Sequence, residues 1–518
     1  MRRIRTLSWA WVVGSVLLPI ARAGGDFNGD GFEDVAIGVP GEDATNIPAT
    51  GLLHVYPGSA NGPDVASSVV FDVKAFGDVA LTAATLGSSI VWGDFDGDGF
   101  DDLAASAVGA PIAGLLDAGR VYVTYGSASG FDMTRARWFD QNTKGIKDKV
   151  EREEKGSTSS DEFFGFSLSS GDYDADGYDD LAIGVIGERI GKHKNSGAVH
   201  VIYGSAVGLR AKRNQLWHQN SKGVRDKCEE HEGFGGALTS GDLNADGFDD
   251  LVIAVGGEAD ATPGFGRAAI LFGSKKRLRA KGNLLVKPES ASHALAVNGS
   301  DAEVQLVVGD FNGDDVTDLV VSVPKEPVGV NGNQNGVVFV AAGPITAATP
   351  PVFTAFIEGD GIVPGTVDSF DNFGASLAVG DFDFDGFDDL AIGAPGETVT
   401  GEGSGRVTVL YGAAGGLATG GATTFDQNTA NVDGVAEMGD QFGFSLAAVD
   451  TEGDGAPELF IGVPGENING EADAGAVNML LGVTMFGLIT ANDQLLYQDQ
   501  PNTPDTSEAE DFFGFAIH

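Results

Sequence analysis

The sequence predicts an all-β protein: a seven-bladed β-propeller of four-stranded blades, closed by the pairing of N- and C-terminal strands within one blade. Three observations predict this fold. An acidic loop recurs seven times, each copy is surrounded by short runs of strand-forming residues, and the last residues begin a repeat that they do not finish. A linear β-solenoid is the alternative, but it would need capping units at its ends, and the sequence shows none.

The first 23 residues are interpreted as a secretory signal peptide, which leaves residues 24–518 for the propeller. Three arginines near the start precede an apolar run over 7–20, and small residues follow at 21–23. The apolar run is too short for a membrane anchor. A second apolar stretch, 474–491, aligns with strand sequences of other repeats. It is therefore expected to be a strand and the turn after it, and no membrane span is predicted.

Charge and cysteine content limit the possible functions. The 518 residues carry a net charge of −44, which becomes −48 without the four arginines of the leader. Such acidity argues against nucleic acid as a partner, because phosphate binding needs a basic surface. Residues 120–290 nevertheless hold 24 of the 31 Lys and Arg residues, against 25 Asp and Glu. The single cysteine, Cys228, rules out an intrachain disulfide and is expected to be a buried thiol.

Each repeat is predicted to form four strands. The acidic loops begin at residues 26, 94, 172, 242, 310, 381 and 450, at intervals of 68 to 78 residues. In the third repeat FGFSLSSGD precedes the loop, DLAIGVIGE follows it and GAVHVIYGS comes later, all apolar or β-branched runs bounded by glycine. NQLWHQNS at 214–221 indicates a fourth strand. The fifth repeat, SDAEVQLVVGD at 300–310, lacks the Phe-Gly pair, so the pattern supports its first strand less. Seven such units are within the range of known propellers.

The two ends of the chain are complementary parts of one repeat. In four repeats the Phe of the Phe-Gly pair lies eight residues before the first loop aspartate, as from Phe164 to Asp172. Counting from Phe513 through the last residue and resuming at residue 24 also gives eight, to Asp26. The C-terminus is therefore expected to supply the first strand of the blade whose other strands come from the N-terminus. Such a closed ring leaves no exposed strand edge.

The loop pattern D-x-[DN]-x-D-G-x-x-D predicts calcium sites. Side-chain oxygens at positions 1, 3 and 5 and a carbonyl at position 7 resemble the early part of an EF-hand loop, and glycine at position 6 permits the sharp turn. An aspartate at position 9 completes the shell, and this many carboxylate oxygens favour Ca²⁺ over Zn²⁺ or Cu²⁺. About six sites are expected. The predicted ligands, with the carbonyl at position 7, are Asp26, Asn28, Asp30, Phe32, Asp34; Asp94, Asp96, Asp98, Phe100, Asp102; Asp172, Asp174, Asp176, Tyr178, Asp180; Asp242, Asn244, Asp246, Phe248, Asp250; Asp310, Asn312, Asp314, Val316, Asp318; and Asp381, Asp383, Asp385, Phe387, Asp389.

Two loops depart from the pattern. The loop at 310 has Asp315 in place of the glycine, a residue that tolerates a left-handed backbone better than most. The loop at 450 has Glu452 and Glu458 in place of shorter ligands and Pro457 beside them, so it is either a seventh, weak site or an empty acidic turn. The paired aspartates of the loops could also form the acid/base pair of an enzyme. Each pair falls within a metal-loop frame, which calcium ligation explains more simply.

With Phe-Gly before the loop and GVPGE (38–42), GAPGE (393–397) and GVPGE (462–466) after it, the repeats resemble FG-GAP repeats, which build the propeller of integrin α-subunits. The resemblance covers essentially all of 24–518. It implies a seven-bladed propeller with calcium in the loops between first and second strands, on the lower face, while ligands or partner subunits meet the upper face. The sequence has no leg region, transmembrane helix or inserted adhesion domain, and more candidate loops than integrins usually have. It resembles the secreted FG-GAP repeat proteins of bacteria more closely.

Two classes of function remain open. The first is a secreted or cell-surface calcium-binding module, a monomeric and non-catalytic ring for adhesion to an extracellular protein or glycan, with the periplasm as an alternative location. The upper-face loops 141–162, 187–197 and 219–233 carry much of the basic charge, so an anionic glycan is one candidate ligand, although a solvated loop of alternating charge is the simpler interpretation. The second is an extracellular enzyme that degrades a polysaccharide or phosphodiester. The seven histidines share no metal-ligand spacing, so no catalytic residue is predicted. The acidity also suits solubility at high salt.

Overall fold

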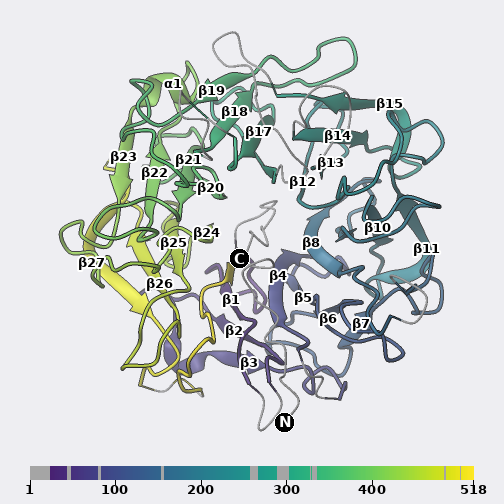
Figure 1. Cartoon of the computed structure of the whole chain (residues 1–518), viewed down its shortest axis with the longest axis horizontal. Coiled ribbons are helices and arrows are strands. Elements are labelled where there is room, and N and C mark those ends of the chain that lie inside the picture. Colours follow the sequence, from purple (N-terminus) through teal and green to yellow (C-terminus); the bar gives the residue numbers. More distant parts are fainter. Residues whose placement is uncertain are drawn as a thin grey trace.

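Seven four-stranded antiparallel sheets surround a central axis in the computed structural model (Figure 1). The structure describes residues 24–518 except 44–47, 80–82, 153–156, 257–265, 289–302, 327, 329–334, 484–485, 502 and 504. The predicted signal peptide, 1–23, lies outside the described residues. The predicted fold class, an all-β seven-bladed propeller, is confirmed.

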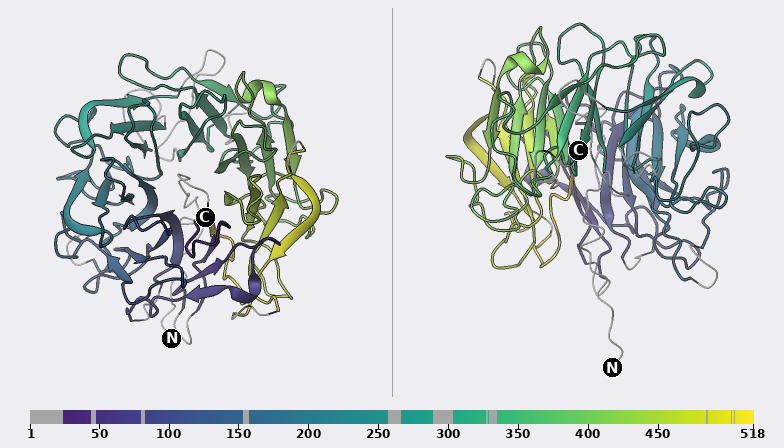
Figure 2. Two further views of the ribbon diagram at one scale, coloured as in Figure 1. Left: turned by 180° about the vertical axis from the view of Figure 1, so that it is seen from behind. Right: turned by 45° about the horizontal axis from the view of Figure 1, so that its top comes forward.

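Within every blade the strands follow one another from the centre to the rim, as Figures 1 and 2 show. Blades 1 to 4 consist of β28 (Ala516–Ile517), β1 (Val35–Val39), β2 (Leu52–Tyr56) and β3 (Val69–Phe71); β4 (Leu86–Gly93), β5 (Asp102–Ala107), β6 (Arg120–Thr124) and β7 (Arg137–Phe139); β8 (Phe164–Gly171), β9 (Asp180–Val185), β10 (Ala198–Tyr203) and β11 (Arg210–Trp217); and β12 (Leu238–Gly241), β13 (Asp250–Val255), β14 (Arg267–Phe272) and β15 (Arg279–Val286).

Blades 5 to 7 have the same order. They consist of β16 (Gln305–Gly309), β17 (Asp318–Val323), β18 (Val337–Ala341) and β19 (Thr354–Phe356); β20 (Ser376–Gly380), β21 (Asp389–Ala394), β22 (Arg406–Leu410) and β23 (Ala422–Phe425); and β24 (Leu446–Val449), β25 (Glu458–Val463), β26 (Ala476–Leu481) and β27 (Ile489–Leu496). The helical elements among the described residues are α1 (Leu417–Gly420) and the 3₁₀ turn η2 (Val65–Ser67), and neither could cross a bilayer.

The second strand of each blade is apolar on both sides because a neighbouring blade covers each of its faces. β9 and β13, for example, are buried over their whole length. The rim strands β11 and β15 contact solvent and mix exposed with buried residues, including the lysines and arginines of this part of the sequence. The hydrophobic core therefore lies between blades rather than in the middle of the ring. This packing explains why the sequence shows short continuous apolar runs for inner strands.

Ring closure occurs as predicted. β28 pairs antiparallel with β1, with Ile517 opposite Ile37 and Ala516 opposite Gly38. The last residue continues the ladder, since the His518 N–H donates to the Ala36 carbonyl at 2.8 Å. The C-terminus lies beside β1 and β4 in Figure 1. The two ends of the described chain thus complete one four-stranded blade, in which β28 is the innermost strand.

The Phe-Gly pair joins five of the blades to the one before. The amide of Phe234 donates to the Ser196 carbonyl at 3.0 Å, the phenylalanines of the other four pairs make the equivalent bond, and Leu86 makes it at a sixth junction among the described residues. The phenylalanines at this position are buried. The glycine that follows takes a left-handed backbone, as at Gly165 with φ 93°, which glycine adopts without steric cost. The recurring pair is thus explained by one turn geometry.

The antiparallel order gives the ring two distinct faces. We call the acidic-loop face the one formed by connections between first and second strands and between third and fourth strands. The linker face is formed by the connections between second and third strands and by the linkers from each blade to the next. The described residues of the predicted upper-face loops 141–162, 187–197 and 219–233 all belong to the linker face.

Two details of the strand predictions are settled by the structure. The stretch 474–491 is β26 followed by a turn and the start of β27, as expected. The fourth strand predicted at 214–221 was placed too late, because β11 covers Arg210–Trp217. The residues after it form a turn instead, closed by the Ser221 N–H that donates to the His218 carbonyl at 2.8 Å. Cys228 is buried, as expected for an unpaired thiol.

Candidate metal centres

All seven acidic loops share one backbone cage. The carboxylate at position 1 accepts the N–H groups of positions 5 and 6, at distances from 2.7 to 3.1 Å. In the first loop these bonds join Asp26 to Asp30 and Gly31. The cage requires a left-handed residue at position 6, and Asp315 adopts it with φ 61°. The missing glycine of the loop at 310 therefore does not change its shape.

The carboxylate at position 9 is buried in every loop, and in six loops it joins the loop to the turn between the third and fourth strands. Asp34 accepts the Phe27 N–H at 2.9 Å and the Gly58 N–H, which lies in the turn between third and fourth strands, at 2.8 Å. The glycine bond recurs for Asp102, Asp180, Asp250, Asp318 and Asp389. Burial raises the pKa of Asp34 to about 8 and that of Asp102 to about 9. A carboxylate in this position favours a compensating positive charge.

Three of the predicted sites bring three carboxylates within 4.8 Å of one another. These groups are Asp94, Asp96 and Asp102; Asp172, Asp174 and Asp180; and Asp381, Asp383 and Asp385. In each loop the Oδ1 atom at position 3, in Asp96, Asp174 and Asp383, is buried and has no hydrogen-bond partner among the described residues. An oxygen in that state has no hydrogen bond to offset its desolvation. The residues present therefore fit a hard cation held between positions 1, 3, 5 and 9.

The loops at 26, 242 and 310 have asparagine at position 3. The side-chain amides of Asn244 and Asn312 donate to the position-9 carboxylates Asp250 and Asp318, at 2.8 and 3.1 Å. Asn28 instead accepts the Asp30 N–H at 2.9 Å. These loops keep the cage, and their metal ligation stays a prediction.

The loop at 450 has the same cage but a different position 9. The Glu458 carboxylate accepts both the backbone N–H and the hydroxyl of Thr451, at 2.9 and 2.6 Å. Its third-position residue, Glu452, belongs to no three-carboxylate group among the described residues. Its status as a seventh site is thus still open.

Arginines approach two of the loops. The Arg135 guanidinium lies 2.5 Å from the Asp96 carboxylate, and the Arg277 guanidinium lies 3.5 Å from the Asp174 carboxylate. Each neutralises part of the local charge. The loop at 381 has no such ion pair among the described residues, so it is the loop in which a cation would have most effect.

Sequence reasoning missed the role of position 8. In five loops the residue at position 8 makes two hydrogen bonds to the residue at position 1 of the preceding blade's loop. The position-8 carboxylate accepts the N–H of that position-1 residue, and the position-8 N–H donates to the position-1 carbonyl. We call this pair of bonds the interblade clamp. The clamps join Asp101 to Asp26, Asp179 to Asp94, Asp249 to Asp172, Asp388 to Asp310 and Glu33 to Asp450. The acidic pairs were interpreted as metal-loop residues throughout, whereas the first member of each pair connects blades. The sequence signal for the interblade clamp is the acidic residue that regularly precedes position 9.

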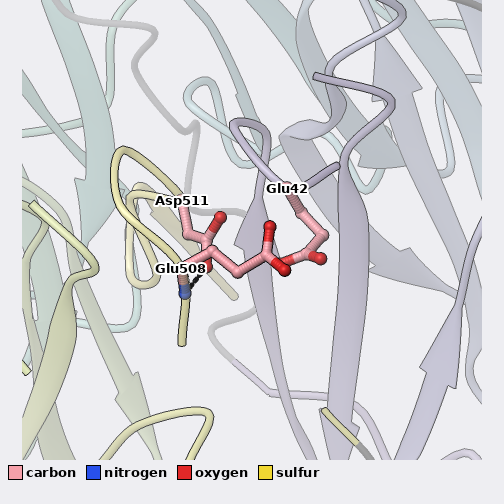
Figure 3. A group of neighbouring side chains, drawn as sticks. All are labelled: Glu42, Glu508 and Asp511. Atoms are coloured by element: carbon pink, nitrogen blue, oxygen red, sulfur yellow. Dashed lines mark hydrogen bonds between the residues drawn. The ribbon is translucent and has the colours of Figure 1, made fainter. Parts of the chain in front are cut away.

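Two further carboxylate groups lie on the linker face, outside every predicted site. One consists of Glu42, Glu508 and Asp511, which point toward one another in Figure 3. The other consists of Glu358, Asp371 and Glu397. The sequence signal was the glutamate of the repeated Gly-Glu pair, which was used only for the family resemblance.

The histidines form no exposed site in the described part of the chain. His54 lies 3.3 Å from the Asp505 carboxylate, a pairing that sequence reasoning did not predict. The ring of His54 is fully buried, so a substrate could not reach it. His200 is also fully buried, and burial lowers its pKa to about 4. Both are packing residues.

Comparison with known proteins assigns the repeats. The sequence model of the FG-GAP repeat matches seven stretches, each ending in or near the third strand of a blade: 23–56, 86–124, 164–202, 234–271, 304–340, 373–410 and 442–477. All but the first, which begins just before an acidic loop, begin at or near the first strand of a blade. The chain belongs to the FG-GAP repeat family. The rim strands and the linkers that follow them lie outside the matched stretches.

Curated relatives share parts of the ring. Over 209 residues the chain is 32% identical to integrin alpha-PS2 of Drosophila melanogaster, covering 39% of this chain and 13% of that integrin. Over 178 residues it is 30% identical to phosphatidylinositol-glycan-specific phospholipase D of Bos taurus, covering 34% of this chain and 20% of that enzyme. The chain thus spans a fifth or less of both relatives. Among solved structures, the Dos1 propeller aligns with a TM-score of 0.36 at 12% identity, over 79% of this chain and 71% of that one, which is too weak to carry an argument.

Proposed function

We infer that this FG-GAP propeller is an extracellular, non-catalytic interaction module braced by Ca²⁺ in its acidic loops. The observation that carries the inference is the buried, unpartnered Oδ1 atom at position 3 in the three loops where carboxylates converge. Carboxylate and carbonyl oxygens in that number are the ligands that Ca²⁺ prefers. The similarity to integrin alpha-PS2 supports the role as an interaction module.

A thermal melt tests the calcium sites. The mature protein in EGTA should gain melting temperature with Ca²⁺ over roughly 10⁻⁴–10⁻³ M, the range of extracellular calcium modules, and much less with Mg²⁺. A free Ca²⁺ concentration about 100 times the dissociation constant of one site stabilises the fold by about 2.7 kcal/mol. Asp383→Asn should reduce the gain, since it removes one ligand charge. A melting temperature that does not change when Ca²⁺ is added would refute the proposal.

The partner surface is assigned to the linker face of blades 3 and 4. The loops 141–162 and 187–197 line one small pocket, with Arg152, Arg189 and Lys194 among its residues. The next linker joins them, since the His231 N–H donates to the Lys194 carbonyl at 3.0 Å. These three loops form a continuous surface with several cations on an otherwise acidic ring. An anionic glycan or an acidic protein segment is the ligand class that such a surface would attract.

Charge neutralisation tests this surface. Replacing Lys147, Lys149, Lys192 and Lys194 by glutamine should weaken binding to an acidic polysaccharide such as heparin at least several-fold. The control replaces two exposed rim lysines, Lys212 and Lys281, which lie on β11 and β15. Equal binding by both variants and the unmodified protein would exclude the glycan role.

An enzyme is the second candidate, favoured by the 30% identity to the glycan-specific phospholipase D. The shared stretch covers one fifth of that enzyme. Turnover of phosphatidylinositol-glycan or polysaccharide substrates by the purified chain, in Ca²⁺ and in EGTA, separates the two functions. Turnover would replace the interaction module with a hydrolase, whereas its absence alongside ligand binding would leave the module as the function.

A further inference from the structure

The junctions between blades repeat a second arrangement of acidic residues on the linker face. Three positions recur: the second residue after the rim strand, the acid two residues before the Phe-Gly phenylalanine, and the glutamate of the Gly-Glu pair. At the junction of blades 2 and 3 these are Gln141, Glu162 and Glu188. The Gln141 amide donates to the Glu188 carboxylate at 2.6 Å. The amide thereby compensates a buried acid.

The same amide bond forms at two other junctions. Gln427 donates to Glu466 at 2.5 Å and Gln498 donates to Glu42 at 2.8 Å. Each glutamine is the second residue after its rim strand. A glutamine amide thus compensates the glutamate of the Gly-Glu pair at these three junctions.

The junction of blades 5 and 6 lacks this donor. The second residue after β19 is Glu358, which can only accept when ionised. Its partners at the junction are Asp371 and Glu397, and one oxygen from each of the three carboxyls lies within 4.8 Å of the others. The residues are only 3%, 0% and 3% exposed. Three acids therefore meet in a place that solvent does not reach.

Glu358 has no hydrogen bond that offsets its burial. Neither of its carboxylate oxygens has a hydrogen-bond partner among the described residues. Its neighbours are partly compensated, since Asp371 accepts the Asp368 N–H at 2.8 Å and Glu397 accepts from the Arg406 guanidinium at 2.7 Å. The three ionised carboxylates and the Arg406 guanidinium sum to a formal charge of −2, and Arg406 also lies 3.9 Å from the Asp426 carboxylate. A buried charge of this kind is unfavourable unless it is paired.

Space beside Glu358 is kept open. A β-carbon built on Gly365 would lie 3.1 Å from Glu358 Oε1, so a side chain at that position would crowd the carboxylate. Gly365 also has a φ of 118°, which disfavours other residues.

We propose that Glu358, Asp371 and Glu397 form a divalent cation site on the linker face, separate from the acidic loops, in which the cation replaces the glutamine amide of the other junctions. A divalent ion matches the residual charge of −2, and carboxylate oxygens select a hard ion such as Ca²⁺. Bound there, it joins the linker between blades 5 and 6 to the connection between the second and third strands of blade 6. The site goes beyond the proposed calcium loops, because none of its residues belongs to them.

The carboxylate group in Figure 3 differs from the proposed cation site. Glu42, Glu508 and Asp511 also approach one another. There Gln498 still donates to Glu42, and Glu508 is exposed. Solvent and an amide already compensate these acids. The cation site is therefore assigned to the junction of blades 5 and 6 alone.

Counting bound ions by native mass spectrometry tests the proposal on the mature full chain in millimolar Ca²⁺. Glu358→Gln converts the junction to the glutamine arrangement of its neighbours, so this variant should fold, and it should bind one ion fewer than the unmodified protein. Asp383→Asn, in the acidic loop at 381, should also lose one ion, and the double variant two. Melting in EGTA should show Glu358→Gln at least as stable as the unmodified chain.

The outcomes separate the two proposals. Equal ion counts for Glu358→Gln and the unmodified protein would overturn the linker-face site. In that case protons shared among the three acids would neutralise the buried group. A count that falls with Glu358→Gln but not with Asp383→Asn would support this site while contradicting the loop at 381. No bound ion in any variant would refute both.

Discussion

At the scale of single residues, the acidic loops fit together by complementary size across each blade junction. Position 7 of one blade is usually aromatic and covers a glycine at position 4 of the preceding blade. A β-carbon on Gly29 would lie 2.4 Å from Phe100, and one on Gly97 would lie 2.7 Å from Tyr178. At the junction of blades 6 and 7 the sizes are exchanged. Phe384 occupies position 4, and a fully buried Ala456 occupies position 7.

This exchange predicts coupling between the two positions. Ala456→Phe should lower the free energy of unfolding by about 1–3 kcal/mol, because the new ring would compete with Phe384 for one space. Adding Phe384→Gly restores the arrangement of the other junctions and should recover most of the loss. Urea unfolding of the single and double variants measures the coupling. Strictly additive effects would contradict the exchange.

Buried acids on the linker face also predict a pH dependence. Burial raises the pKa of Glu188 from 4.5 to about 9, with a further contribution from the charge of Glu162. The folded state therefore holds this proton more tightly than the unfolded state does. Its stabilising contribution is complete below pH 4.5 and is lost as the pH rises toward 9. In EDTA, stability should fall between pH 5 and pH 8.

Glu188→Gln isolates this contribution, since it removes the titration and keeps a partner for Gln141. The melting temperature of the variant should fall less steeply between pH 5 and pH 8 than that of the unmodified protein. Parallel slopes would show that Glu188 titrates normally in the fold.

At the scale of elements, the interblade clamp connects hairpins that share no strand pairing. Five junctions have the clamp, and two lack it, because position 8 is Thr317 in blade 5 and Pro457 in blade 7. Neither side chain offers a carboxylate to the neighbouring backbone. The clamp thus depends on a single side chain at each junction, with the strands on either side unchanged.

Removing one clamp should be measurable. Asp179→Ala leaves the Asp94 N–H without the carboxylate that it contacts at 2.9 Å. The loss of a hydrogen bond to a charged group should cost about 1.5–3 kcal/mol of stability in denaturant unfolding. Thr317→Ala, at the same loop position without a clamp, is the control and should change stability by less than about 0.5 kcal/mol. Equal losses in the two variants would exclude a role for the clamp.

At the scale of the whole molecule, two distant segments form one blade. β28 supplies the inner strand, and the next residues in the repeat are those at the start of the described chain, where the Asp34 N–H donates to the Gly25 carbonyl at 2.8 Å. In the other blades these segments are continuous in sequence. The break in the chain therefore falls inside a blade, and the hydrogen bonds of β28 hold the ring shut.

The closure predicts that a circular permutant needs no linker. Joining His518 directly to Gly24, with new ends between the exposed residues Ala414 and Gly415, should give a folded ring at least as stable as the natural order. The control has the same new ends and six added residues at the junction, and should be less stable by roughly 1 kcal/mol, because a longer loop is more costly to order. A thermal melt compares them. A clearly more stable linker variant would refute the predicted register.

The sequence by itself determined the number of blades, their four-stranded order, the closure and the positions of the acidic loops. These features repeat in the chain, and each depends on local chemistry: alternation of apolar runs, glycine at left-handed positions and carboxylates at fixed spacing. Asp315 was expected to replace glycine, and its backbone does so.

Only the tertiary structure decided which contacts the residues make across the blade junctions. Asp179 bonds to the neighbouring blade, Phe384 packs against Gly455 of the next blade, and Glu358 lies close to Asp371 and Glu397. Each of these relations joins residues of different blades or connections, which no spacing along the chain specifies. Whether a carboxylate is a clamp, a metal ligand or an uncompensated buried charge depends on which donors surround it, and those donors are brought together only when the ring closes.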